Sequence, residues 1–233
     1  MNKYSKRNVV SRSVPSFISI TMIHLLGGPP RVGKSTIAGM IRKRHAISAV
    51  STDSLSAVLD GVWCDETAPD FFVMDRFRDL SPTAKERAIA DDFAEPLKYL
   101  IEQDTVVWKA AVAFAKREHE EGRDILIEGT GIIPELVNQL DALPHRVVFV
   151  GNQAENHSES IRRSARDNPN DWMRRATDQY IDLFARFVMR MSVYIEQEAR
   201  KHDFEYIETG NRSLEDAADL VVKSLGIIDG GGS

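Results

Sequence analysis

The chain has 233 residues, of which 42% are hydrophobic and 28% are charged, and its formal net charge is −5. This length suits one α/β domain with an inserted substrate region, or one large domain, and it allows a sizeable hydrophobic core. The negative charge gives no support to a nucleic-acid surface, which would normally show a basic excess. A single cysteine, Cys64, excludes an internal disulfide and fits a reducing, cytoplasmic compartment.

The first residues are basic and precede an apolar run, as in a secretory signal. No small-residue cleavage site lies between that run and the glycine-rich motif that follows it. We therefore expect a flexible basic tail over residues 1–15 and a first strand over residues 17–26. Translation could also begin at Met22, which would shorten this strand. No stretch is apolar for the length needed to span a membrane.

Residues 28–36 have the form G-x-x-x-x-G-K-[ST], which is the pattern of a phosphate-binding loop. Its two glycines permit backbone angles that let successive N–H groups turn toward an anion. Lys34 can reach the outer phosphates as a point charge, and the Ser35 hydroxyl can ligate Mg²⁺. A strand before the loop and apolar residues at helical spacing after it provide the context that this motif requires. The predicted nucleotide-binding residues are Gly28, Pro29, Pro30, Arg31, Val32, Gly33, Lys34, Ser35 and Thr36.

The next part of the chain combines a short strand with a long helical region. A second strand is predicted over residues 46–51, and Asp53 or Ser54 can cap a short helix after it. Residues 61–122 follow with a helical, acidic pattern that three prolines interrupt. Because this segment is too long for a simple crossover, we expect a helical insertion that closes with a helix from Val106 to Glu121.

Strands and helices alternate in the second half. Strands are predicted over residues 124–129, 146–151 and 204–207, and a polar, Arg-rich segment lies between residues 152 and 170. An apolar stripe from Met173 to Ile195 then predicts a long amphipathic helix. After the last strand, Ser213 can cap a final helix.

The alternation of strands and helices predicts an α/β fold, with a parallel sheet of about five strands covered by helices on both faces. In such a sheet the functional groups gather at the carboxyl ends of the strands, where the phosphate-binding loop, Asp53 and Glu128 all fall. Ser35 and a carboxylate, Glu128 or Asp53, would hold Mg²⁺. Asp53 would then orient or deprotonate a hydroxyl group. The alternatives are that Asp53 caps a helix and that Glu128 binds loop amides.

Four segments together carry a family resemblance: residues 27–36, residues 51–54, the helical insertion, and the Ile-Glu-Gly strand end with its following proline at residues 127–134. With them the chain resembles the adenylate-kinase-like group of P-loop small-molecule kinases, and within that group it is most similar to 2-phosphoglycerate kinase. The resemblance implies a three-layer P-loop kinase domain over residues 16–228, with an acceptor-binding insertion at 61–122. It also implies an Arg-rich lid at 152–170, and we expect a flexible, linker-like tail at 229–233.

The predicted lid carries Arg162, Arg163 and Arg166, which would close over the transferring phosphoryl group. Arg162 and Arg166 are the predicted catalytic pair, and we expect Arg166 to matter most because it neighbours both other arginines on a helix. A solvated basic helix face is the alternative. The resemblance also implies that Asn211 borders the adenine. Arg76 and Arg78 in the insertion could bind an anionic acceptor, and placement on the surface is the alternative.

The sequence therefore predicts an ATP- and Mg²⁺-dependent enzyme that transfers the γ-phosphoryl group to a hydroxyl or phosphate of a small molecule, catalysed by Lys34, Asp53, Glu128 and the lid arginines. The first candidate for the acceptor is 2-phosphoglycerate or a similar anionic metabolite. A nucleoside, nucleotide or antibiotic kinase is an alternative. A regulatory or toxin-like ATPase switch is an alternative of another class. The expected partners are ATP and the acceptor, with no nucleic acid and no membrane.

Overall fold

The computed structural model describes residues 21–91, 93–140 and 143–227. The predicted tails at 1–15 and 229–233, and residues 17–20 of the expected first strand, lie outside these ranges. In chain order the described elements are β1 (Ile23–Gly27), α1 (Lys34–His45), β2 (Ser48–Ser51), α2 (Thr52–Asp60), α3 (Asp75–Arg78), α4 (Pro82–Ala90), α5 (Ala94–Glu120), β3 (Ile125–Gly129), α6 (Pro134–Val137), η1 (Asn138–Leu140), β4 (His145–Gly151), α7 (His157–Asp167), η2 (Trp172–Arg175), α8 (Asp178–Lys201), β5 (Glu205–Glu208) and α9 (Leu214–Leu225).

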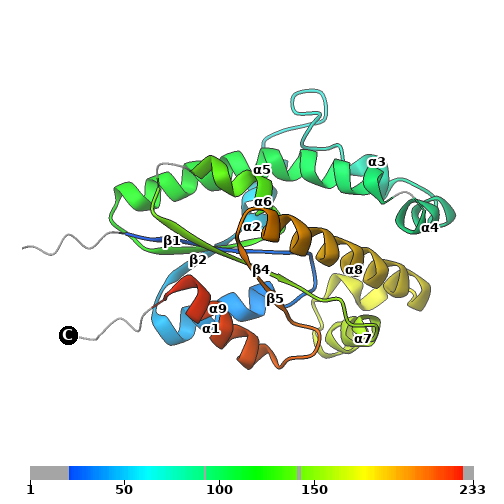
Figure 1. Cartoon of the computed structure of the whole chain (residues 1–233). Coiled ribbons are helices and arrows are strands. Elements are labelled where there is room, and N and C mark those ends of the chain that lie inside the picture. The colour runs from blue at the N-terminus through cyan, green and yellow to red at the C-terminus, as the bar shows by residue number, and fades with distance from the viewer. Residues whose placement is uncertain (1–20, 92, 141–142, 228–233) are drawn as a thin grey trace, which may run out of the picture.

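The five strands form one sheet in the order β2-β3-β1-β4-β5, and every neighbouring pair is parallel. Helices α1 and α9 pack together against one face of the sheet, whereas α5, α6 and α8 lie on the other face (Figure 1). The predicted α/β fold with three layers is thus confirmed. Strand β1 lies at the centre of the sheet, so the loop that follows it opens at the middle of the carboxyl edge.

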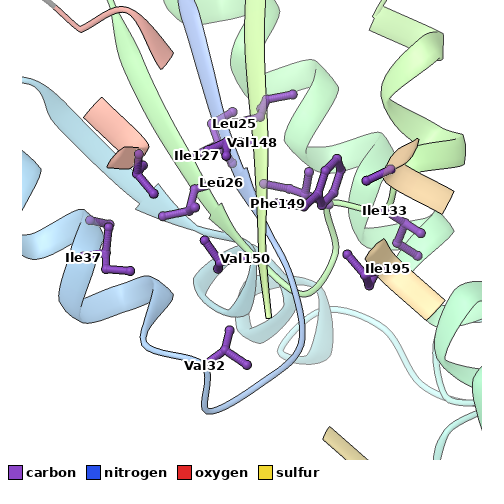
Figure 2. Close-up of a cluster of buried hydrophobic side chains, with 14 of the residues drawn as sticks. Leu25, Leu26, Val32, Ile37, Ile127, Ile133, Val148, Phe149, Val150 and Ile195 are labelled. Atoms are coloured by element: carbon purple, nitrogen blue, oxygen red, sulfur yellow. The ribbon is translucent and has the colours of Figure 1, made fainter. Parts of the chain in front are cut away.

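The central strands are buried on both faces, which is why their sequences read as continuous apolar runs. Leu25 and Leu26 of β1 point to opposite faces, and both are fully buried. Val148 and Phe149 of β4 repeat this arrangement beside them (Figure 2). Apolar packing on both faces of the same strands therefore positions the carboxyl edge of the sheet.

Two helix boundaries differ from the sequence prediction. The expected helix from Val106 to Glu121 is the second half of α5, which begins at Ala94 and spans 27 residues. The expected long helix from Met173 begins only at Asp178, because the Thr177 side chain caps it by accepting a hydrogen bond from the N–H of Tyr180. The apolar periodicity continued across this boundary and concealed it.

Gly27 ends β1 at a point where the strand packs tightly against its neighbour. A Cβ atom added there would collide with the ring of Phe149 and would lie 2.7 Å from the backbone oxygen of Ile132. Gly39 of α1 is the opposite case, since nothing lies within 4 Å of its added Cβ.

We predict opposite effects for alanine at these two glycines. Gly27→Ala should lower the free energy of unfolding by roughly 1–3 kcal/mol through overpacking. Gly39→Ala should raise it by about 0.5–1 kcal/mol because glycine is unfavourable inside a helix. Urea unfolding of both variants checks the prediction, and a Gly27→Ala protein as stable as the wild type would contradict it.

Candidate functional site

The phosphate-binding loop joins β1 to α1 and depends on unusual backbone angles. Gly28 has φ 143° and Gly33 has φ 96°, both in the region that side chains disfavour. A Cβ atom at Gly28 would also collide with the backbone oxygen of Val150. Gly33 directly precedes α1, so the amino end of this helix faces the loop. The arrangement is that of an anion cradle made of backbone N–H groups.

Lys34 is the first residue of α1, and its side chain is buried, with 6% of the residue exposed. Its Nζ donates a hydrogen bond of 2.6 Å to the backbone oxygen of Pro29. Burial lowers the pKa of Lys34, while the nearby carboxyl groups of Glu128, Asp53 and Asp104 act to raise it. Three acidic side chains therefore act on the buried ammonium group of Lys34.

Glu128 lies at the end of β3, where the Ser35 hydroxyl donates a hydrogen bond of 2.9 Å to its Oε1. Burial raises the pKa of Glu128, and Lys34 and Ser35 partly offset this rise. The hydroxyl and carboxylate oxygens are the hard ligands that Mg²⁺ prefers. Among the described residues no group of three His, Cys, Asp or Glu could hold a metal ion. These ligands fit Mg²⁺ that takes its other ligands from phosphates and water.

A cavity of about 550 Å³ opens over the phosphate-binding loop. Residues 30–36 form its floor, α7 and Trp172 form one wall, and the loop after β5 forms another. Its volume lies within the range of about 300–1,000 Å³ that is usual for pockets of drug-sized ligands. A phosphate-binding floor in a pocket of this size suits a nucleoside triphosphate.

Gly210 and Arg212 of the loop after β5 line this cavity. The Oε1 atom of Glu208 shapes the loop by accepting hydrogen bonds from the N–H groups of Gln153 (3.0 Å) and Gly210 (2.8 Å). Asn211 lies between the two lining residues and is exposed. Its contact with adenine stays a prediction.

The three arginines of the predicted lid lie on α7 and face different surroundings. Arg162 donates hydrogen bonds to Asp178 (2.7 Å) and Asp182 (2.6 Å) of α8, and it is not among the residues that line the cavity. Arg163 lines the cavity. Arg166 is exposed and is not among the lining residues. The catalytic role predicted for Arg162 and Arg166 is untested, and Arg163 is the arginine of the three that the structure brings to the cavity.

Arg31 of the phosphate-binding loop forms a bidentate ion pair with Asp171, with N–O distances of 2.7 and 3.1 Å. Asp171 also caps η2 by accepting a hydrogen bond from the N–H of Met173. Burial would raise the pKa of Asp171, but the bonds from Arg31 and Met173 prevail and lower it. The Arg31 guanidinium lies 5.8 Å from the centre of the Trp172 ring. The loop is thereby tied to the segment that follows α7.

The expectation that Asp53 or Ser54 caps the helix after β2 is wrong. Ser51 is the cap, and its hydroxyl accepts hydrogen bonds from the N–H groups of both residues. Asp53 instead occupies the first turn of α2, where it lines the cavity over the phosphate-binding loop. Its carboxylate is therefore available for a ligand.

A second cavity, of about 270 Å³, lies between α2, α3 and α5. Asp53 and Thr130 line both cavities, so the two spaces meet at these side chains. The other polar groups of the second cavity include Arg78, Gln103 and Asp104.

Asp104 of α5 is a site residue that the sequence analysis missed. The residue is 4% exposed, and its Oδ2 atom has no hydrogen-bond partner in the described structure. Burial first, and then the charge of Asp53, raise the pKa of Asp104 to about 8, against the opposing charge of Lys34. A signal was present in the sequence, because Asp104 lies on the helical stripe that continues through Trp108, Ala111 and Ala115.

Comparisons with known proteins agree with this geometry. The chain is 26% identical over 223 residues to the 2-phosphoglycerate kinase of Pyrococcus horikoshii, which covers 92% of this chain and 69% of the relative. It is 26% identical over 209 residues to the 2-phosphoglycerate kinase of Methanocaldococcus jannaschii, covering 89% and 63% of the two chains. The chain thus spans about two thirds of the length of these relatives. The predicted resemblance to P-loop small-molecule kinases is confirmed, and the similarities support a phosphotransferase.

A solved structure described as a sugar kinase from Janibacter sp. HTCC2649 has the same fold, with a TM-score of 0.50, 13% identity, and coverage of 91% of this chain and 98% of the other. No model of a protein family matches the chain. In the part of the chain that the structure describes, no helix combines the length and the apolar character needed to cross a bilayer.

The burial of Asp104 predicts how stability depends on pH. Its pKa rises from an ordinary value near 3.8 to about 8 on folding. Between these two values the folded state binds one proton more than the unfolded state, so this group lowers the free energy of unfolding as pH rises. The slope is up to roughly 1.4 kcal/mol for each pH unit. Asp104→Asn removes the group, so the variant should gain stability over the wild type from pH 5 to pH 8.

Urea unfolding at each pH unit in this window provides the measurement. Glu102→Gln is the matched control, because Glu102 lies two residues before Asp104 in α5 and forms a partly exposed ion pair with Lys98 at 3.7 Å. The free energy of unfolding of Glu102→Gln should stay within about 0.5 kcal/mol of the wild-type value at each pH. Parallel pH curves for Asp104→Asn and the wild type would show that Asp104 is ionised in the folded protein.

Proposed function

We propose that this protein is an ATP-dependent kinase that transfers the γ-phosphoryl group to a small acceptor held in the second cavity. The observation that supports this proposal is the meeting of two cavities at Asp53 and Thr130. The first cavity contains the phosphate-binding loop, and the second has polar side chains without such a loop. Transfer between two ligands needs this arrangement, whereas an ATPase switch without an acceptor gives no account of the second cavity.

The donor side is built from the phosphate-binding loop and β3. The backbone N–H groups and Lys34 would hold the donor phosphates, and Ser35 and Glu128 would hold Mg²⁺. When bound, the metal ion neutralises charge on the donor oxygens. Asp53 lies where the cavities meet, so it would orient the acceptor and take its hydroxyl proton while the acceptor oxygen bonds to the γ-phosphorus and ADP leaves.

The second cavity favours a small, anionic acceptor. Its volume of about 270 Å³ falls below the range of about 300–1,000 Å³ for drug-sized ligands, which speaks against an antibiotic or a whole nucleotide. Arg78 supplies a cation at its wall. The first candidate is 2-phosphoglycerate, since relatives at 26% identity carry that name.

The test is a screen of a metabolite library with ATP labelled in the γ-position. We expect transfer of label to a small hydroxylated anion, with 2-phosphoglycerate tested first. Lys34→Ala is the control: it removes a side chain that faces the loop rather than the core, so it should lose transfer by a factor of at least about a hundred while remaining folded. Hydrolysis of ATP that no library member accelerates would refute the kinase proposal.

The surroundings of the lid arginines give a second prediction. Arg163→Ala should reduce turnover by roughly a hundredfold, the usual effect of losing one donor to the transferring group, with little change in thermal stability. Arg162→Ala should mainly lower thermal stability, because Arg162 is bound to Asp178 and Asp182 of α8. Steady-state kinetics and thermal unfolding of both variants and of Arg166→Ala provide the measurement. The largest loss of turnover in Arg166→Ala would favour the assignment made from the sequence instead.

A further inference from the structure

Two neighbouring side chains of α5 present buried oxygen atoms that have no partner. Oε1 of Gln103 and Oδ2 of Asp104 are both inaccessible to solvent and form no hydrogen bond with the described residues. Both residues line the second cavity. A buried polar atom without a partner costs about 1–3 kcal/mol, so two in one place indicate that a ligand or water satisfies them.

We propose that Asp104 and Gln103 recognise the acceptor's hydroxyl group, the same group whose proton Asp53 takes, so that the second cavity selects a small hydroxy acid over an acid of equal size without the hydroxyl. This inference rests on the proposed function, because it assigns the specificity of the same acceptor cavity. A hydroxyl group offers one donor and two acceptor positions, which matches the mixed requirement of an amide and a carboxyl group.

The charges of the cavity agree with an acid at the other end of the acceptor. Arg78 lines the cavity and pairs with Asp75 at 2.7 Å, but both side chains are about half exposed (60% and 47%). An exposed pair of this kind contributes little stability, so Arg78 can exchange Asp75 for a carboxylate or phosphate of the ligand at small cost. The described lining of the second cavity therefore combines the Arg78 cation with two oxygen atoms, from Gln103 and Asp104, that would bind a hydroxyl group.

The protonation of Asp104 determines how it would bind. Its pKa of about 8 keeps the carboxyl group neutral at pH 7, and the entry of an anion would hold it neutral more firmly. A neutral carboxyl group can donate one hydrogen bond and accept another. Asparagine keeps both capacities at nearly the same size, whereas leucine keeps only the size.

The same geometry gives Asp104 an alternative role, because its carboxyl group, once ionised, raises the pKa of Lys34. A residue that only balances Lys34 would affect ATP binding and leave the choice of acceptor unchanged. The two roles are therefore separated by comparing acceptors that differ in one hydroxyl group.

The experiment measures binding of 2-phosphoglycerate and of 2-phospholactate, which lacks the hydroxyl, by isothermal titration to the full chain at pH 7 with a non-hydrolysable ATP analogue. The wild type should bind 2-phosphoglycerate at least about tenfold more tightly. Asp104→Leu and Gln103→Leu should each reduce this ratio toward one, with unchanged affinity for the ATP analogue. Asp104→Asn and the control Glu102→Gln should retain most of it.

Each other outcome overturns the inference. A ratio near one in the wild type, or a ratio that neither leucine variant reduces, means that these side chains do not read the hydroxyl, even if the library screen shows transfer. If Asp104→Leu loses affinity for the ATP analogue but keeps the ratio of the two acceptor affinities, then Asp104 acts on Lys34 and not on the acceptor. Binding of neither compound means that the cavity does not take this class of acid, and the screen then decides separately whether the protein is a kinase.

Discussion

The buried ammonium group of Lys34 is the charge on which this edge of the sheet depends. Its burial is unfavourable, and the carboxyl groups of Glu128 from β3 and Asp53 from α2 offset this cost, while Asp104 from α5 lies nearby as a neutral carboxyl group at pH 7. These residues are far apart in the sequence and meet because parallel strands end at the same edge. Apolar side chains pack against both faces of β1 and β4, and this packing positions the strand ends that carry the charged groups (Figure 2).

The parts of this structure that local sequence determines were predictable. Residues 28–36 specify their loop through two glycines with positive φ, and the continuous apolar strands specify a sheet buried on both faces. The capping residue of α2 was harder to predict from the sequence, because Ser51 and Asp53 are both good capping residues and lie only two positions apart. Ser51 becomes the cap because the register of β2 against β3 makes it the last residue of the strand. That register depends on the whole sheet and not on the local sequence.

Orientation around a helix was the harder problem, as α7 shows. Spacing alone says that Arg166 neighbours both Arg162 and Arg163, but it does not say which face meets the ligand. Ile161 and Ala165 determine how α7 is rotated about its axis, because both side chains are buried against apolar side chains of η2 and α8. At about 100° per residue, Arg163 lies roughly opposite this buried side and Arg162 lies beside it, next to the acids of α8.

The protonation of Asp104 decides how much negative charge an acidic acceptor would meet in the second cavity. Asp53 and an ionised Asp104 together would repel an acidic ligand from a space of limited volume. With Asp104 neutral at pH 7, one of these two charges is absent, and Lys34 and Arg78 can outweigh the other. Burial disfavours the ionised form of Asp104 more than the charge of Lys34 favours it. The same burial that makes this carboxyl group costly to ionise would therefore let it lie beside the proposed acidic acceptor and donate a hydrogen bond to its hydroxyl group.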